Sequence, residues 1–150
     1  MTERVDFYVL KSAADPKRWA FACRLTEKAY LRELRVVIVN DSPADARALD
    51  ELLWTFNDSS FIPHQVCLDE KTPDPATMVY LTALPAAAPA ADLLLNLSGR
   101  LPVQWERYAR IAEIIDADEE RRRLGRERFK SYRDLKVTLE THQLGDGPEN

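Results

Sequence analysis

Cysteine and histidine are the side chains in this sequence that could bind a transition metal, and they are few and widely spaced. Zinc sites in proteins use these ligands in closely spaced pairs. Only two of the four candidates are near one another, the full set being Cys23, His64, Cys67 and His142. We therefore interpret Cys67 as a core thiol and His64 as a loop histidine, and we expect no metal ion.

A nucleophile with an organised base is also missing from the sequence. Ser59 and Ser60 stand near His64, but no GxSxG turn accompanies them. Asp50 and Glu51 are adjacent in the chain, so they point to different sides of a helix and are interpreted as solvated charges. We expect no catalytic residue in this chain.

A phosphate-binding loop depends on glycine, because backbone amides at a helix N-terminus approach a phosphate only where no Cβ intervenes. None of the four glycines follows either of the first two expected strands, residues 5–10 and 35–40. These glycines are Gly99, Gly125, Gly145 and Gly147. We therefore expect a fold of the nucleotide-binding type without its phosphate loop, and no cofactor.

A basic and aromatic stripe lies on the helix expected within residues 118–135, mostly in the segment GRERFKSYRDLK, residues 125–136. On a helical wheel, four cations fall on one side and a phenyl ring lies at the border of their arc. The acidic residues of the segment lie mostly elsewhere. Such a surface suits an acidic ligand that also brings an apolar group. The stripe consists of Arg122, Arg126, Phe129, Lys130 and Arg133.

The opposite side of the same helix is predicted to face the core. Leu124 and Leu135 lie on that side, together with Tyr132. Arg128 also falls near the core side, so its guanidinium would have to reach solvent along the helix surface.

A second unusual surface is predicted in LDELLWTFNDSSFIPH, residues 49–64. Trp54 lies outside the apolar arc of its helix, so it should be partly exposed. Phe61 and Pro63 follow in a loop and could form a patch with it. The indole could instead be covered by another layer. We favour an interface, because exposed aromatic side chains concentrate at the centres of protein interfaces.

The scaffold that positions these segments is predicted to be an α/β fold. Residues 5–10 and the continuously apolar run 35–40 indicate strands, and residues 16–33 indicate a helix between them. Ser42 is the expected N-cap of the next helix, with Pro43 at its first position. A strand, helix, strand order predicts a parallel pair. We expect a three-layer Rossmann-like sandwich with a mostly parallel sheet.

The remaining segments complete one domain, residues 1–140, followed by a flexible C-terminal tail, residues 141–150. The tail lacks apolar periodicity. Strands are expected within residues 76–84, 91–97 and 111–116, and helices within 103–109 and 118–135.

Composition limits the class of protein. The chain has 150 residues, of which 45% are hydrophobic and 31% charged, which suits one soluble domain. It has no apolar run long enough to span a membrane and no signal-peptide layout, so we expect a cytoplasmic protein. A net charge of -4 argues against coating nucleic acid by charge alone. We expect any contact with DNA to be indirect.

Two segments, VVIVNDSPADARALDELL and ADLLLNLSGRLP, resemble the receiver domains of response regulators. The resemblance would place Asn96 at the position of the phosphorylatable aspartate, and an amide cannot form an acyl phosphate. Asn40 or Asp41 would leave one carboxylate where Mg²⁺ usually meets two. The receiver fold would also have no counterpart for the strand and helix expected in residues 4–33. A degenerate receiver-type regulatory domain therefore stays as the alternative interpretation.

The segments LDELLW, SFIPH and RERFKSYR, with FYVL near the start and LETHQL near the end, resemble the chi subunit of bacterial DNA polymerase III. The likeness follows the chain in order over nearly its whole length. The sequence departs from the family in LREL before the second expected strand, where the family often has a glycine. The alanine-rich loop 85–91 is also peculiar to this chain.

The resemblance implies a non-catalytic, cytoplasmic accessory subunit of the clamp-loader assembly in DNA replication. Chi joins the clamp loader through the psi subunit. It also binds the acidic C-terminal tail of single-stranded DNA-binding protein, which ends in Phe and a free carboxylate. A helicase can compete with psi for the same surface. Carried over by motif, the tail site would use Arg126, Phe129, Lys130 and Arg133, and the psi-facing surface Trp54, Phe61 and Pro63.

Overall fold

The computed structural model describes residues 2–13, 15–57, 61–68, 73–84 and 87–144. Its centre is a seven-stranded sheet in which every recorded strand pair is parallel, in the order β3-β4-β2-β5-β6-β1-β7. The strands are β1 (Arg4–Leu10), β2 (Val36–Val39), β3 (His64–Val66), β4 (Val79–Thr82), β5 (Leu93–Asn96), β6 (Arg110–Ile115) and β7 (Leu139–Leu144). The helices are α1 (Asp15–Leu31), α2 (Pro43–Thr55), the 3-10 helix η2 (Trp105–Arg107) and α3 (Glu119–Asp134).

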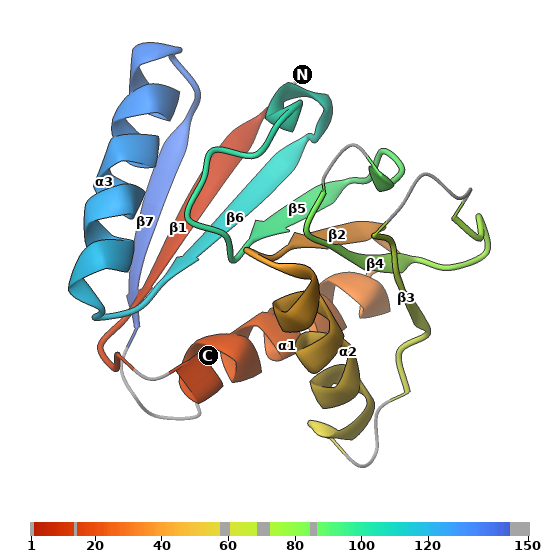
Figure 1. Ribbon diagram of the computed structural model, residues 1–150. Helices are drawn as coiled ribbons and strands as arrows, with labels where there is room; N and C mark the ends of the chain where they lie inside the picture. The colour runs from red at the N-terminus through yellow and green to blue at the C-terminus, as the bar shows by residue number, and fades with distance from the viewer. Residues whose placement is uncertain (1, 14, 58–60, 69–72, 85–86, 145–150) are drawn as a thin grey trace.

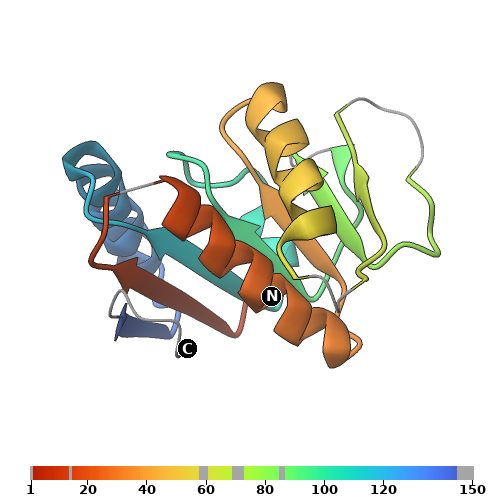
Figure 2. The same ribbon diagram turned by 90° about the horizontal axis from the view of Figure 1, so that it is seen from below.

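The helices cover the two faces of the sheet, as the predicted three-layer α/β sandwich requires. α1 and α2 lie on one face and α3 on the other (Figures 1 and 2). β3 and β7 form the two ends of the sheet, with α3 beside β7 and α2 near β3 (Figure 1). The predicted fold class is therefore confirmed.

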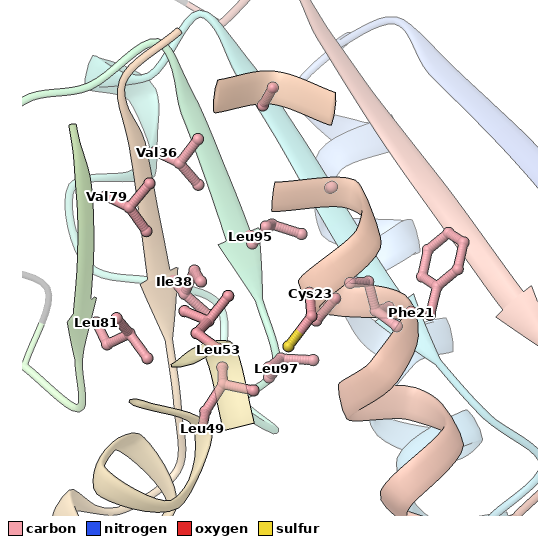
Figure 3. Packing of buried hydrophobic residues seen from close by; sticks show 14 of the residues in the cluster. Phe21, Cys23, Val36, Ile38, Leu49, Leu53, Val79, Leu81, Leu95 and Leu97 are labelled. Carbon is pink, nitrogen blue, oxygen red and sulfur yellow. The ribbon is translucent and has the colours of Figure 1, made fainter. Parts of the chain in front are cut away.

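Two hydrophobic clusters follow from the alternation of side chains along each strand. Val36 and Ile38 point to the cluster under α1 and α2, where Figure 3 shows Ile38 near Leu53. Val37 and Val39 point to the opposite cluster. All four β2 residues are buried, which confirms the prediction from its continuous apolar run.

Capping fixes where two of the helices begin. The Ser42 hydroxyl accepts from the Asp45 backbone amide across 3.1 Å, and Pro43 occupies the first turn of α2, as predicted. At α3, the Asp118 carboxylate accepts from the Arg121 amide across 2.9 Å. Both caps lie at the carboxyl edge of the sheet, because each helix follows a parallel strand.

The structure corrects several predicted segments. β3 and β7 were both missed, and residues 141–144, which we assigned to a flexible tail, instead pair with β1 as the end of β7. Residues 145–150 lie outside the described part of the chain. The helix expected at 103–109 is only the short η2. Leu135, expected in the core, caps α3 and is 61% exposed.

Candidate functional site

Close packing at Gly125 sets the position of α3 on the sheet. A Cβ added there would clash with Cδ1 of Ile115 on β6. Glycine inside a helix costs about 0.5–1 kcal/mol relative to alanine. The close approach of α3 to β6 therefore explains a residue that helix propensity disfavours.

A buried polar network also anchors α3 to the sheet. Glu113 on β6 accepts from Arg128 Nε across 3.0 Å and from the Tyr132 hydroxyl across 2.9 Å. It also accepts from the side-chain amide of Asn96 on β5 at 3.0 Å. Burial raises the pKa of Tyr132, and the Glu113 carboxylate raises it further. The inward guanidinium of Arg128 corrects the prediction that it would reach solvent.

The stripe on the outer side of α3 is largely as the helical wheel predicts. Arg126, Lys130 and Arg133 are exposed, and Phe129 is half-buried against Phe7, with ring centroids 5.2 Å apart. Among the described residues, neither Arg126 nor Lys130 has a recorded hydrogen bond or ion pair, whereas Arg133 lies 3.8 Å from Asp134. Two cations of the stripe are therefore available to an external anion.

The acidic residues of α3 are engaged with a different arginine. Arg123 contacts Glu120 at 2.7 Å and Glu127 at 3.3 Å. The hydrogen bond from Arg123 lowers the pKa of the Glu120 carboxyl. Neither acid neutralises Arg126 or Lys130, as predicted from the helical wheel.

A cavity of about 230 Å³, which we call the α3 cavity, opens between α3 and the strands β1, β6 and β7. Its walls combine apolar side chains with two arginines and two polar residues of β7, the full lining being Phe7, Val9, Ile115, Arg122, Gly125, Arg126, Phe129, Thr141 and Gln143. Of the predicted tail-binding residues, Arg126 and Phe129 line this cavity. Lys130 and Arg133 do not line it, although they lie on the same helix.

The sequence-based prediction missed the β7 side of this cavity. Thr141 and Gln143 were assigned to a flexible tail, whereas both lie in a strand paired with β1. The apolar residues of LETHQL stand only at its ends, Leu139 and Leu144. Only the pairing with β1 identifies this segment as a strand.

The predicted aromatic patch forms at the other end of the sheet. Trp54 on α2 is 45% exposed and Phe61 is 70% exposed, with ring centroids 5.4 Å apart. Pro63 follows in the same loop and is partly exposed. We call Trp54, Phe61 and Pro63 the Trp54 patch. Trp54 is exposed because Leu49 and Leu53 form the buried side of α2.

His64 lies behind the Trp54 patch, a position that the sequence did not reveal. Its side chain is fully buried, and its ring centroid lies 4.1 Å from that of Trp54. Nε2 is 2.9 Å from the Asp50 carboxylate. Asp50 is therefore not a solvated charge, and His64 begins β3 instead of lying in a loop. The two serines near His64 in the sequence, Ser59 and Ser60, lie outside the described residues.

The remaining candidates have structural contacts. Cys23 and Cys67 are buried cysteines that are not in a disulfide, and burial raises the pKa of Cys23 to about 12. His142 is 3.0 Å from the Asp6 carboxylate and stacks on Tyr8. Within the described ranges, no group of three or more His, Cys, Asp or Glu side chains could hold a metal ion. The same ranges contain no helix of the length and apolarity that crossing a membrane requires.

Comparison with solved structures finds a domain of similar fold. The chain resembles a structure described as Mss116p DEAD-box helicase domain 2 bound to an RNA duplex, with a TM-score of 0.59 and 12% sequence identity. The match covers 95% of this chain and 64% of that one, so this chain spans less than two thirds of its length. At this identity the likeness concerns the fold alone.

Comparison of the sequence gives a narrower result. The family model described as DNA polymerase III chi subunit, HolC, matches residues 1–140. The DNA polymerase III subunit chi of Pseudomonas aeruginosa is 34% identical over 141 residues, which is 94% of this chain and 96% of the relative. That of Haemophilus influenzae is 26% identical over 97% of this chain and 100% of the relative. The Escherichia coli subunit is 24% identical over 79% of this chain and 80% of the relative. The chain therefore belongs to the DNA polymerase III chi subunit family.

Proposed function

We propose that this chain links two partners within the clamp-loader assembly: the psi subunit at the Trp54 patch, and the acidic C-terminal tail of single-stranded DNA-binding protein at the α3 cavity. Membership of the chi family makes it an accessory subunit of DNA polymerase III. The finer assignment of partners and residues is our proposal. In this scheme the chain contacts DNA only through its partners and works in the cytoplasm.

The α3 cavity has the chemistry that an acidic peptide ending in Phe requires. Phe7 and Phe129 provide an apolar wall for the terminal ring. Arg126 borders the same cavity and can donate to the terminal carboxylate. Lys130 and Arg133 lie farther along α3, where they can attract the Asp residues that precede the ring.

The Trp54 patch has the chemistry of a protein interface. Two adjacent exposed aromatic rings are unusual on a surface that faces only water, and such rings often carry much of the binding energy at interfaces. We assign this patch to psi, with a helicase as a competitor for the same surface.

The observation that carries the proposal is the placement of the two surfaces at opposite ends of the sheet. Six strand spacings separate β3 from β7, or about 29 Å at the usual distance between strands. The two sites also involve helices on opposite faces (Figure 1). Both partners can therefore bind one chain at the same time, as a linking subunit requires.

The test is a ternary complex in analytical ultracentrifugation, with the full chain, psi and a fluorescent tail peptide. We expect one species that contains all three components. Trp54→Ala should remove psi and retain the peptide, and Arg126→Ala should do the reverse. Displacement of the peptide by psi would contradict simultaneous binding.

We further propose that the chain performs no phosphate chemistry of its own. The receiver-type alternative requires a phosphoacceptor, whereas Asn96 is buried and donates to Glu113. The purified protein should neither hydrolyse ATP nor accept phosphate from a small donor. A stoichiometric acyl phosphate detected by mass spectrometry would restore the receiver interpretation.

A further inference from the structure

We infer that His64 is a positioning residue for the Trp54 patch, because its buried ring holds the Trp54 indole in the orientation that presents Trp54 and Phe61 to a partner. This inference rests on the proposed function of the patch. The inference adds to the Trp54 patch a residue, His64, that would not itself contact the partner. The evidence is the set of contacts around the His64 ring.

Hydrogen-bond acceptors fix the His64 ring on two sides. Nδ1 lies 2.7 Å from the backbone carbonyl of Ile62, and Nε2 lies 3.0 Å from the backbone carbonyl of Asp50. The Asp50 carboxylate is a further acceptor, 2.9 Å from Nε2. A hydrogen on either ring nitrogen therefore has an oxygen acceptor within hydrogen-bond distance.

The geometry of α2 connects these hydrogen bonds to the indole. Asp50 and Trp54 are four residues apart, so their side chains leave the same side of the helix. A ring from β3 that bonds to Asp50 therefore lies against Trp54. The centroids of the His64 and Trp54 rings are 4.1 Å apart, closer than the 5.4 Å between Trp54 and Phe61.

This support has a consequence for binding. An exposed side chain loses rotamer freedom when a partner covers it, at a cost of about 0.5–1.5 kcal/mol per immobilised side chain. His64 restricts the indole before the partner arrives. Its loss should weaken partner binding without removing any atom of the interface.

The chain contains a matched control for the replacement of His64: a histidine with similar contacts that lies far from the Trp54 patch. His142, the only other histidine, also stacks on an aromatic ring, with a centroid distance of 4.7 Å to Tyr8. It also contacts a buried carboxylate, Asp6, at 3.0 Å. His142 pairs with β1 at the opposite end of the sheet from the Trp54 patch.

The first experiment is ¹⁹F NMR of the full chain labelled with 5-fluorotryptophan, which should give three signals, from Trp19, Trp54 and Trp105. Trp54→Phe assigns the Trp54 signal. His64→Gln keeps a donor that can reach Asp50 but removes the ring. We expect this variant to shift and narrow the Trp54 signal while the other two stay in place. His142→Gln should leave the Trp54 signal unchanged.

The second experiment is calorimetric titration of the same variants with psi and with the tail peptide. His64→Gln should weaken psi binding roughly two- to tenfold, which corresponds to the ordering cost of one side chain. Tail affinity should be unchanged. His64→Phe restores an aromatic ring without its hydrogen bonds, and it should recover only part of the psi affinity.

The outcomes separate this inference from the proposed function. An unmoved Trp54 signal in His64→Gln, or psi affinity equal to wild type, overturns the role of His64. A shift of all three signals also overturns it, because His64 would then support the whole fold. If Trp54→Ala leaves psi binding unchanged, the psi assignment fails, while the NMR result still decides whether His64 positions the indole.

Discussion

The Nε atom of Arg128 on α3 donates to Glu113 on β6 across 3.0 Å, and both side chains are buried. The same carboxylate accepts from Tyr132 of α3 and Asn96 of β5. One acidic group thus joins two strands to the helix that carries the proposed tail site. The network fixes the helix while its outer cations remain exposed.

Replacing Arg128 with Met leaves the Glu113 carboxylate buried without its counter-charge. Because removal of one partner from a buried pair is strongly destabilising, we expect the free energy of unfolding to fall by about 3–5 kcal/mol. Urea unfolding measures this change. The double variant Arg128→Met with Glu113→Gln should recover part of the loss, since Gln is neutral and can still accept from Tyr132. Strictly additive effects would show that the two residues are not coupled.

Binding of a peptide with several Asp residues and a terminal Phe tests the stripe on α3. Arg126→Ala or Lys130→Ala should each weaken binding by about 1–3 kcal/mol, the range for hydrogen bonds to charged groups. Arg123→Ala is the matched control, because Arg123 is on the same helix but already contacts Glu120 and Glu127. Fluorescence anisotropy provides the affinities.

The charge of the peptide can be tested separately in the same assay. Added salt should weaken binding, because exposed charges are screened over about 10 Å at 0.1 M. Amidation of the terminal carboxylate should weaken it further, since an Arg or Lys donor then loses a charged acceptor. Tighter binding of an oligonucleotide than of the peptide would identify the stripe as a nucleic-acid site.

Loss of either ring from the Trp54 patch should weaken psi binding. We expect Trp54→Ala or Phe61→Ala to cost about 2 kcal/mol or more, as for central aromatic residues of interfaces. Leu31→Ala is a suitable control, because Leu31 is 73% exposed at the end of α1, outside the patch. Size-exclusion chromatography near the dissociation constant reports the complex. Unchanged co-elution of both aromatic variants would refute the assignment.

The glycine in α3 allows a test of the close packing between helix and sheet. Gly125→Ala should lower the free energy of unfolding by about 1–3 kcal/mol, the usual cost of overpacking. Ile115→Val removes the Cδ1 atom that the new Cβ would meet. The two changes together should therefore cost less than the sum of the single changes. Equal costs with and without Ile115→Val would show that another contact limits the position of α3.

The central part of the fold could be predicted from the sequence because its signals are local. β2 is a continuous apolar run, and Ser42 with Pro43 marks the start of α2. The edge strands carry no comparable signal. Taken as whole residues, those of β3 are all partly exposed, although the His64 side chain is buried, and those of β7 are partly buried or exposed. Their strand conformation depends on pairing with β4 and β1, which no local pattern reveals.

The same distinction explains which candidate site residues could be predicted from the sequence. Arg126 and Trp54 stand out on a helical wheel, since their position depends only on the helix that contains them. Thr141 and His64 belong to edge strands, so their neighbours become known only when the sheet is assembled. Gly125 is similar, because its importance depends on the approach of Ile115 from another element.

The placement of the two surfaces at opposite ends of the sheet also determines how the protein would respond to tension. A pull between partners held at these ends acts across the strands, along the hydrogen bonds that join them, so it would separate neighbouring strands one bond at a time. β1 and β7 pair over six residue positions, whereas β3 and β4 pair over three. Under load, the edge next to the Trp54 patch should therefore detach first, and the edge that carries the α3 cavity should hold longer.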